Sequence, residues 1–96
     1  MITKRRAPRN GHVRVTFVLD RPDAETVCVA GDFTAWRTSR PMRRSEDGTW
    51  RVGVELRSGC EYGFRYLVDG VHWVNDPSAD KYVPNPYGSE NSVVVT

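Results

Sequence analysis

The sequence predicts an all-β domain, an antiparallel β-sandwich built from short strands. Three observations predict it. Apolar and polar residues alternate with period two in several segments, turn-forming residues separate these segments at intervals of roughly 8 to 12 residues, and no segment keeps helical periodicity over three turns. The 96 residues, 39% of them hydrophobic and 27% charged, suit one globular domain of this kind.

Residues 1–12 and 13–96 differ in pattern. The first segment is polar and basic and is interrupted by Pro8 and Gly11, so we expect a flexible basic N-terminal segment. Regular alternation begins at Val13, and nothing later in the chain indicates a second domain. We therefore expect one β-sandwich domain over residues 13–96.

Two strands are expected in the first third of this domain. From Val13 to Leu19 every second residue is apolar, as in a strand with one buried face. From Thr26 to Ala30 apolar residues stand at consecutive positions, which is typical of a central strand covered on both faces. This second strand ends at Gly31.

The middle of the chain carries one clear strand. Between Trp36 and Gly48 the chain is polar and Arg-rich, and only Pro41–Met42 is compatible with a short strand. From Trp50 to Leu56 every second residue is apolar. We therefore assign Trp50 to the core and not to a binding site.

A hairpin follows, and its alternation is the cleanest in the chain. Arg65 falls on the face opposite the aromatic residues and is expected to point outward. Asp69–Gly70 supplies a tight turn, because both central residues of the favoured hairpin turn need positive φ. Trp73 comes just after the turn, and Asn91–Val95 is expected as the last strand. The predicted core face of the hairpin consists of Tyr62, Phe64, Tyr66 and Val68.

Composition argues against several classes of partner. The formal net charge of +2 does not favour nucleic acid, and no apolar run reaches membrane-spanning length. The N-terminus lacks the apolar core of a signal peptide, so we expect a cytoplasmic protein without membrane contact. Cys28 and Cys60 have no CxxC partner and are expected to be reduced thiols.

Catalytic motifs are also missing from the sequence. A glycoside hydrolase needs two carboxylates that flank a cleft, whereas the acidic residues here are scattered through turns. His12 and His72 lie far apart and have no ligand-type spacing, and there is no nucleophile elbow or phosphate-binding glycine loop. We predict no enzymatic activity, no cofactor and no metal.

Several segments taken together resemble carbohydrate-binding module family 48. This family includes the glycogen-recognition domain of AMP-activated protein kinase β subunits and the early-set domains of isoamylases and glycogen-branching enzymes. The resemblance covers roughly Val13 to Val95 and implies an immunoglobulin-like early-set sandwich that holds α-1,4-linked glucan on an aromatic face. The segments are VCVAGDFTAW, DGTWRVGVEL, YGFRYLVDG, the Trp after it, NDP and NPYGSENSVVV.

The resemblance also implies which residues bind carbohydrate. The two stacking tryptophans of the family fall on Trp36 and Trp73, although Val71 and His72 both precede Trp73 where kinase-type domains have one residue. The basic residue that bonds sugar hydroxyls falls on Arg65, where Lys is usual, and Tyr87 replaces a Leu. The full implied set is Trp36, Arg65, Trp73, Tyr87, Ser89 and Asn91.

These residue types suit a sugar on chemical grounds. A pyranose presents a face of C–H groups to flat aromatic rings and a rim of hydroxyls to fixed donors and acceptors. The Arg65 guanidinium and the Asn91 amide supply such groups. The alternatives are that Trp36 or Trp73 covers the core and that Arg65 forms an ion pair with a carboxylate such as Glu55.

We therefore predict a noncatalytic module that binds α-glucan such as glycogen or maltooligosaccharides. The alternative is a protein-interaction or regulatory module that associates with a separate glucan-metabolising enzyme or kinase and has lost sugar binding. Nucleic-acid binding through the Arg-rich N-terminus is the weakest candidate, and it predicts a steep salt dependence.

Overall fold

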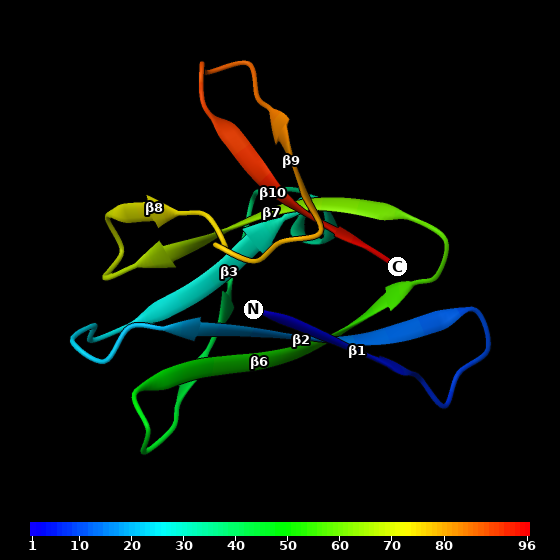
Figure 1. The fold of residues 1–96 in the computed structure, drawn as a ribbon, viewed down its shortest axis with the longest axis horizontal. Coiled ribbons are helices and arrows are strands. Elements are labelled where there is room, and N and C mark those ends of the chain that lie inside the picture. Colours follow the sequence, from blue (N-terminus) through cyan, green and yellow to red (C-terminus); the bar gives the residue numbers. More distant parts are fainter.

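The computed structural model describes all 96 residues and consists of two packed antiparallel sheets (Figure 1). This confirms the predicted all-β sandwich. The first sheet has four strands in the order β1-β2-β6-β5: β1 (Ile2–Arg6), β2 (His12–Asp20), β6 (Thr49–Arg57) and β5 (Arg43–Arg44). The second has the order β4-β3-β7-β10-β9 with β8 also paired to β7: β3 (Val27–Gly31), β4 (Arg40–Pro41), β7 (Glu61–Val68), β8 (His72–Val74), β9 (Lys81–Pro84) and β10 (Glu90–Val95).

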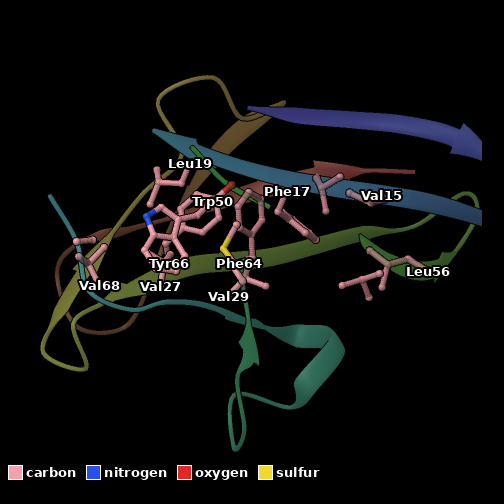
Figure 2. Close-up of a cluster of buried hydrophobic side chains, with 14 residues drawn as sticks. Val15, Phe17, Leu19, Val27, Val29, Trp50, Leu56, Phe64, Tyr66 and Val68 are labelled. Carbon is pink, nitrogen blue, oxygen red and sulfur yellow. The ribbon is translucent and has the colours of Figure 1, made fainter. Parts of the chain in front are cut away.

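The core lies between the two sheets and is made by the alternating residues of their inner faces (Figure 2). Phe17 from β2 meets Phe64 from β7 edge to face, with ring centroids 4.8 Å apart, and Phe64 meets Tyr66 in the same way at 5.6 Å. Such pairs stabilise a core by about 0.5 to 1.5 kcal/mol beyond their burial. Trp50 is 6% exposed, and its indole N–H donates to the carbonyl of Arg21 at 2.9 Å, so its predicted place in the core is confirmed.

The N-terminal segment departs from the sequence-based expectation. We expected a flexible tail over residues 1–12, but Ile2–Arg6 forms the edge strand β1, paired along its whole length with β2. This strand buries little side-chain surface, because Lys4 and its neighbours are exposed and only Ile2 packs against the core. A prediction from alternating apolar residues therefore does not identify this strand.

The polar stretch after Trp36 also forms more structure than expected. The single short strand expected at Pro41–Met42 is replaced by two, β4 and β5, on either side of Met42. Met42 is buried in the core, and its N–H donates to the carbonyl of Val27 at 2.8 Å. The chain therefore crosses from one sheet to the other at Met42, with one two-residue strand in each sheet.

The Asp69–Gly70 turn has the predicted geometry. Asp69 and Gly70 have φ values of 54° and 73°, both in the left-handed region that the favoured two-residue turn requires. The Asp69 side chain does more than initiate the turn, because its Oδ1 accepts the backbone N–H groups of Glu25 and Thr26 at 2.7 and 3.0 Å. These two bonds lower the pKa of Asp69 below its ordinary 3.8.

No helix in the structure is long and apolar enough to cross a membrane. The only helical element is the 3-10 turn η1 (Asp32–Thr34), which follows β3. Cys28 and Cys60 are both free thiols.

Candidate carbohydrate-binding site

Arg65 lies where two strands part from the same side of β7. β10 pairs with β7 from Glu61 to Phe64, whereas β8 pairs with it from Tyr66 to Val68. Arg65 is therefore left between the two pairings on that side, and on the other side it pairs with Ala30 of β3. The sheet therefore forks at Arg65, because β10 and β8 leave β7 on either side of this residue.

The chain between β8 and β9 holds this fork open. The Asn75 side chain donates to the carbonyl of Glu90 at 2.9 Å and accepts the N–H of Ser92 at 3.0 Å, so it bonds β10 where that strand leaves β7. Asp76 is fully buried, and its Oδ2 accepts the Tyr66 hydroxyl at 2.7 Å. Burial and this carboxylate raise the pKa of Tyr66 well above its ordinary value, so the hydroxyl stays a donor.

Arg65 itself is half-buried and has no ion-pair partner. Its Nε is buried without a hydrogen bond, and no carboxylate lies within ion-pair distance of its guanidinium. The expected alternative, an ion pair with Glu55, does not form, because Glu55 belongs to β6 in the other sheet. A half-buried guanidinium with unused donors is suited to receive hydroxyl oxygens of a ligand.

Trp36 is held by a short, tightly bonded loop. The Trp36 N–H donates to the carbonyl of Gly31 at 3.0 Å, and the Thr34 hydroxyl bonds both backbone groups of Gly31 at 2.9 and 3.1 Å. Asp32 fixes the ring: its Oδ1 accepts the indole N–H at 2.8 Å while its Oδ2 accepts the Gly63 N–H at 2.6 Å. The indole is thereby attached to β7 through a single carboxylate.

The backbone around Trp36 is strained. Ala35 and Trp36 have φ values of 55° and 56°, in the left-handed region that costs a residue with a side chain about 1 to 2 kcal/mol. The bonds of the loop offset this cost and keep the ring in place, 40% exposed. Trp36 is therefore a surface side chain in a fixed position, and it does not cover the core.

Trp73 emerges on the same sheet face through a bulge. The Val71 N–H donates to the carbonyl of Val68 at 3.2 Å, and the strand register also pairs Val68 with His72. Val71 and His72 therefore both lie opposite Val68, which is a β-bulge. The extra residue, Val71, is 70% exposed and leaves the ladder undisturbed beyond it. Trp73 then pairs with Leu67, two positions from Arg65 on the outward face, and is 48% exposed.

The β9–β10 hairpin, which extends from the body of the molecule in Figure 1, supplies the other side of the site. Asn85 organises its loop: Oδ1 accepts the N–H groups of Tyr87 and Ser89 at 2.9 and 3.2 Å, and Nδ2 donates to the Ser89 hydroxyl and to Asn91 Oδ1 at 2.8 and 3.2 Å. Tyr87 at the tip is 91% exposed. The side-chain oxygen Oδ1 of Asn91 therefore has a partner. The side-chain N–H groups of Asn91 have no acceptor in the protein.

These elements enclose a groove of about 590 Å³. Five of the six residues expected at the site line it, and Ser89, whose N–H and hydroxyl both bond Asn85, does not. Sequence reasoning missed Asn85 and Pro86. The only available signal was the Asn-Pro dipeptide, which indicates a turn but not its role in a site. The lining residues are Trp36, Arg65, Trp73, Asn85, Pro86, Tyr87 and Asn91.

The groove offers flat rings and hydrogen-bond donors but no catalytic pair. Its lining contains no carboxylate, whereas acid–base hydrolysis of a glycosidic bond needs two. No group of three or more His, Cys, Asp or Glu side chains lies together in a way that could hold a metal ion. Rings beside a guanidinium and an amide can stack on a pyranose and bond its hydroxyls.

Comparison with known proteins identifies the family. The family model described as the glycogen recognition site of AMP-activated protein kinase matches residues 13–96. The chain belongs to this family. It is 34% identical over 82 residues to the rice protein FLOURY ENDOSPERM 6, chloroplastic, and 35% identical over 68 residues to the β subunit of 5'-AMP-activated protein kinase from Schizosaccharomyces pombe.

The chain matches only a part of each of these relatives. The aligned region is 85% of this chain but 15% of the rice protein, and 71% of this chain but 22% of the yeast subunit. The 1,4-alpha-glucan branching enzyme GlgB of Photobacterium profundum is 40% identical over 52 residues, 7% of its length. Because the rice relative is named chloroplastic, the cytoplasmic location expected from the sequence stays a prediction.

A solved structure supports the fold alone. The enterobactin esterase FES from Shigella flexneri superposes with a TM-score of 0.78 over 98% of this chain and 32% of its own, at 13% sequence identity. An identity this low says nothing about shared activity.

Proposed function

We propose that this domain is a noncatalytic module that binds α-1,4-linked glucan in the groove between Trp36, Trp73 and Tyr87. The observation that carries the proposal is the convergence of these rings with the Arg65 guanidinium in one groove, although they come from four separate segments of the chain. The family match and the names of relatives, a kinase β subunit and glucan branching enzymes, support α-glucan as the ligand class.

The proposed binding mode assigns a role to each side of the groove. Trp36 and Trp73 stack on sugar faces from the sheet, and Tyr87 meets the glucan from the hairpin tip. Arg65, which lines the groove, donates to hydroxyls through the terminal N–H groups of its guanidinium. The Asn91 amide donates to a neighbouring hydroxyl.

The affinity should be low. A groove open to water contacts few sugar units. Each sugar hydroxyl gives up a hydrogen bond to water when it bonds the protein, so the net free energy of binding is small. We expect dissociation constants between micromolar and millimolar, which is roughly 4 to 8 kcal/mol.

The test is a titration of the domain with glycogen and with a cyclic maltooligosaccharide, followed by tryptophan fluorescence. Trp36 and Trp73 are exposed, while Trp50 is buried in the core, so a fluorescence change reports mainly on the groove. Saturable binding with cellobiose as an inert control supports the proposal. No response at millimolar sugar contradicts it.

A second candidate is a protein-interaction module that associates with a separate glucan enzyme or kinase without binding sugar. Two observations favour it: Val71 bulges into solvent beside Trp73, and Tyr87 stands almost fully exposed without packing partners. It predicts that a variant lacking all three rings still copurifies with its partner. The loss of copurification together with sugar binding would exclude this candidate.

A further inference from the structure

A second groove lies at the C-terminal end of β10, the opposite end from Asn91, where the β1–β2 hairpin meets the turn between β6 and β7. Its volume is about 700 Å³, and no acidic side chain lines it. Lys4 forms an ion pair with Asp80 at 2.7 Å, but Arg5, Arg6 and Arg9 have no carboxylate within ion-pair distance. We call it the basic groove. Its polar lining includes Lys4, Arg5, Arg6, Arg9, Asn10, His12 and Ser58.

The arrangement of these charges is unfavourable for the isolated domain. The register places Arg5 of β1 directly opposite Arg14 of β2, and like charges opposite each other destabilise a sheet. Gly53 on β6 leaves the space into which the Arg14 guanidinium turns, and no ion pair forms between Arg14 and its register partner Glu55. Among the Lys and Arg side chains that line the groove, only Lys4 is paired with a carboxylate.

The basic groove also borders an unpaired sheet edge. β1 ends the strand order of its sheet, and Ala7 and Met1 on either side of it bond β2 through their backbones. Because backbone groups alternate along a strand, the N–H and C=O groups of Lys4 and Arg6 point to the free edge. No hydrogen bond to these groups is made elsewhere in the chain.

Cations on an edge strand commonly serve to block pairing with other strands. They block pairing selectively, however, because a second copy of this cationic edge is repelled whereas an acidic strand is attracted. The groove contains no Phe, Tyr or Trp ring on which a nucleic-acid base could stack. The geometry points to an extended acidic segment of a partner protein that pairs with the free edge of β1 and places its carboxylates in the basic groove.

This site is separate from the glucan groove, with which it shares no lining residue. The domain can therefore hold a partner at one end and a glucan at the other. The two functions fail independently: loss of acidic-segment binding leaves the sugar titration unchanged, and loss of sugar binding leaves acidic-segment binding unchanged.

The test uses a fluorescent peptide that alternates Glu with Val and Thr and has about ten residues, the upper end of common strand lengths. Its matched control is the same peptide with alternate backbone nitrogens methylated, which keeps the charge and removes edge pairing. Anisotropy at about 50 mM salt, where the screening length exceeds 10 Å, gives the affinity. Amide hydrogen exchange gives the location, and the peptide should slow the exchange of Lys4 and Arg6.

Two protein variants separate the groove from overall charge. Arg6→Gln with Arg9→Gln should weaken peptide binding roughly ten-fold, while Arg21→Gln with Arg40→Gln, an equal charge change outside the groove, should weaken it less than about two-fold. Equal effects of both variants, equal binding of the methylated peptide, or tighter binding of a DNA duplex than of the peptide would each overturn the proposal. Unchanged glucan titration and melting temperature show that the variants are folded.

Discussion

The backbone of Gly63 approaches Gly31 so closely that position 31 has no room for a side chain. A Cβ built on Gly31 would lie 2.3 Å from the carbonyl oxygen of Gly63 and 2.9 Å from the Cβ of Phe64. Gly31 has extended backbone with φ of −179°, so close approach and not turn geometry requires glycine here. This contact brings the end of β3 against β7 and sets where the loop to Trp36 begins.

Gly31→Ala should therefore destabilise the domain by at least about 2 kcal/mol, because backbone must move to relieve the clash. The control is Gly53→Ala, where the nearest atoms belong to the flexible end of the Arg14 side chain. We expect a loss below about 1 kcal/mol there. Urea unfolding measures both, and equal losses would show that the Gly31 contact is not special.

Asp32 should control both stability and the Trp36 ring. Asp32→Ala leaves the Gly63 N–H and the indole N–H without their acceptor, so we expect a loss of about 1 to 3 kcal/mol in unfolding free energy and weaker glucan binding. Asp32→Asn keeps one accepting oxygen and should be intermediate in both. If Asp32→Ala is destabilised but binds glucan with unchanged affinity, the carboxylate does not position the ring.

Asn85 should matter for binding more than for stability. Asn85→Ala removes four hydrogen bonds inside an exposed hairpin loop, so Tyr87 and Asn91 lose their fixed positions. We expect glucan affinity to fall about three- to ten-fold with little change in melting temperature. Asn10→Ala, in the loop of the other exposed hairpin, is the matched control and should leave affinity unchanged.

Asp69 should make the domain acid-sensitive. Its pKa is lowered in the folded state by the Thr26 and Glu25 N–H groups, so its carboxylate stabilises the fold above its unfolded pKa and this contribution is lost as the pH falls below 3.8. Melting temperatures of wild type and Asp69→Asn should therefore differ near neutral pH and converge in acid. A difference that stays constant from pH 7 to strongly acid solution would contradict this.

The sequence predicts the long strands well, because alternation in β2, β6 and β7 reflects one buried face directly. It does not predict β1, whose residues are polar and whose pairing depends on the free edge of β2. The family resemblance places Trp36 and Arg65 in the expected site, and alternation turns Arg65 outward. The support given by Asp32, which bonds the distant Gly63, and by the side chain of Asn85 within its loop is not encoded in any local pattern. The bulge at Val71 likewise depends on where β8 finds its register on β7.

The central claim is tested most directly by the affinity of Trp36→Ala for a cyclic maltooligosaccharide, measured by calorimetry beside wild type and Val71→Ala. Trp36 lines the groove and Val71 does not, although both are exposed. We predict that Trp36→Ala weakens binding at least about ten-fold, equivalent to 1.4 kcal/mol, and that Val71→Ala leaves it unchanged. Wild-type affinity in a folded Trp36→Ala variant would contradict the proposed site.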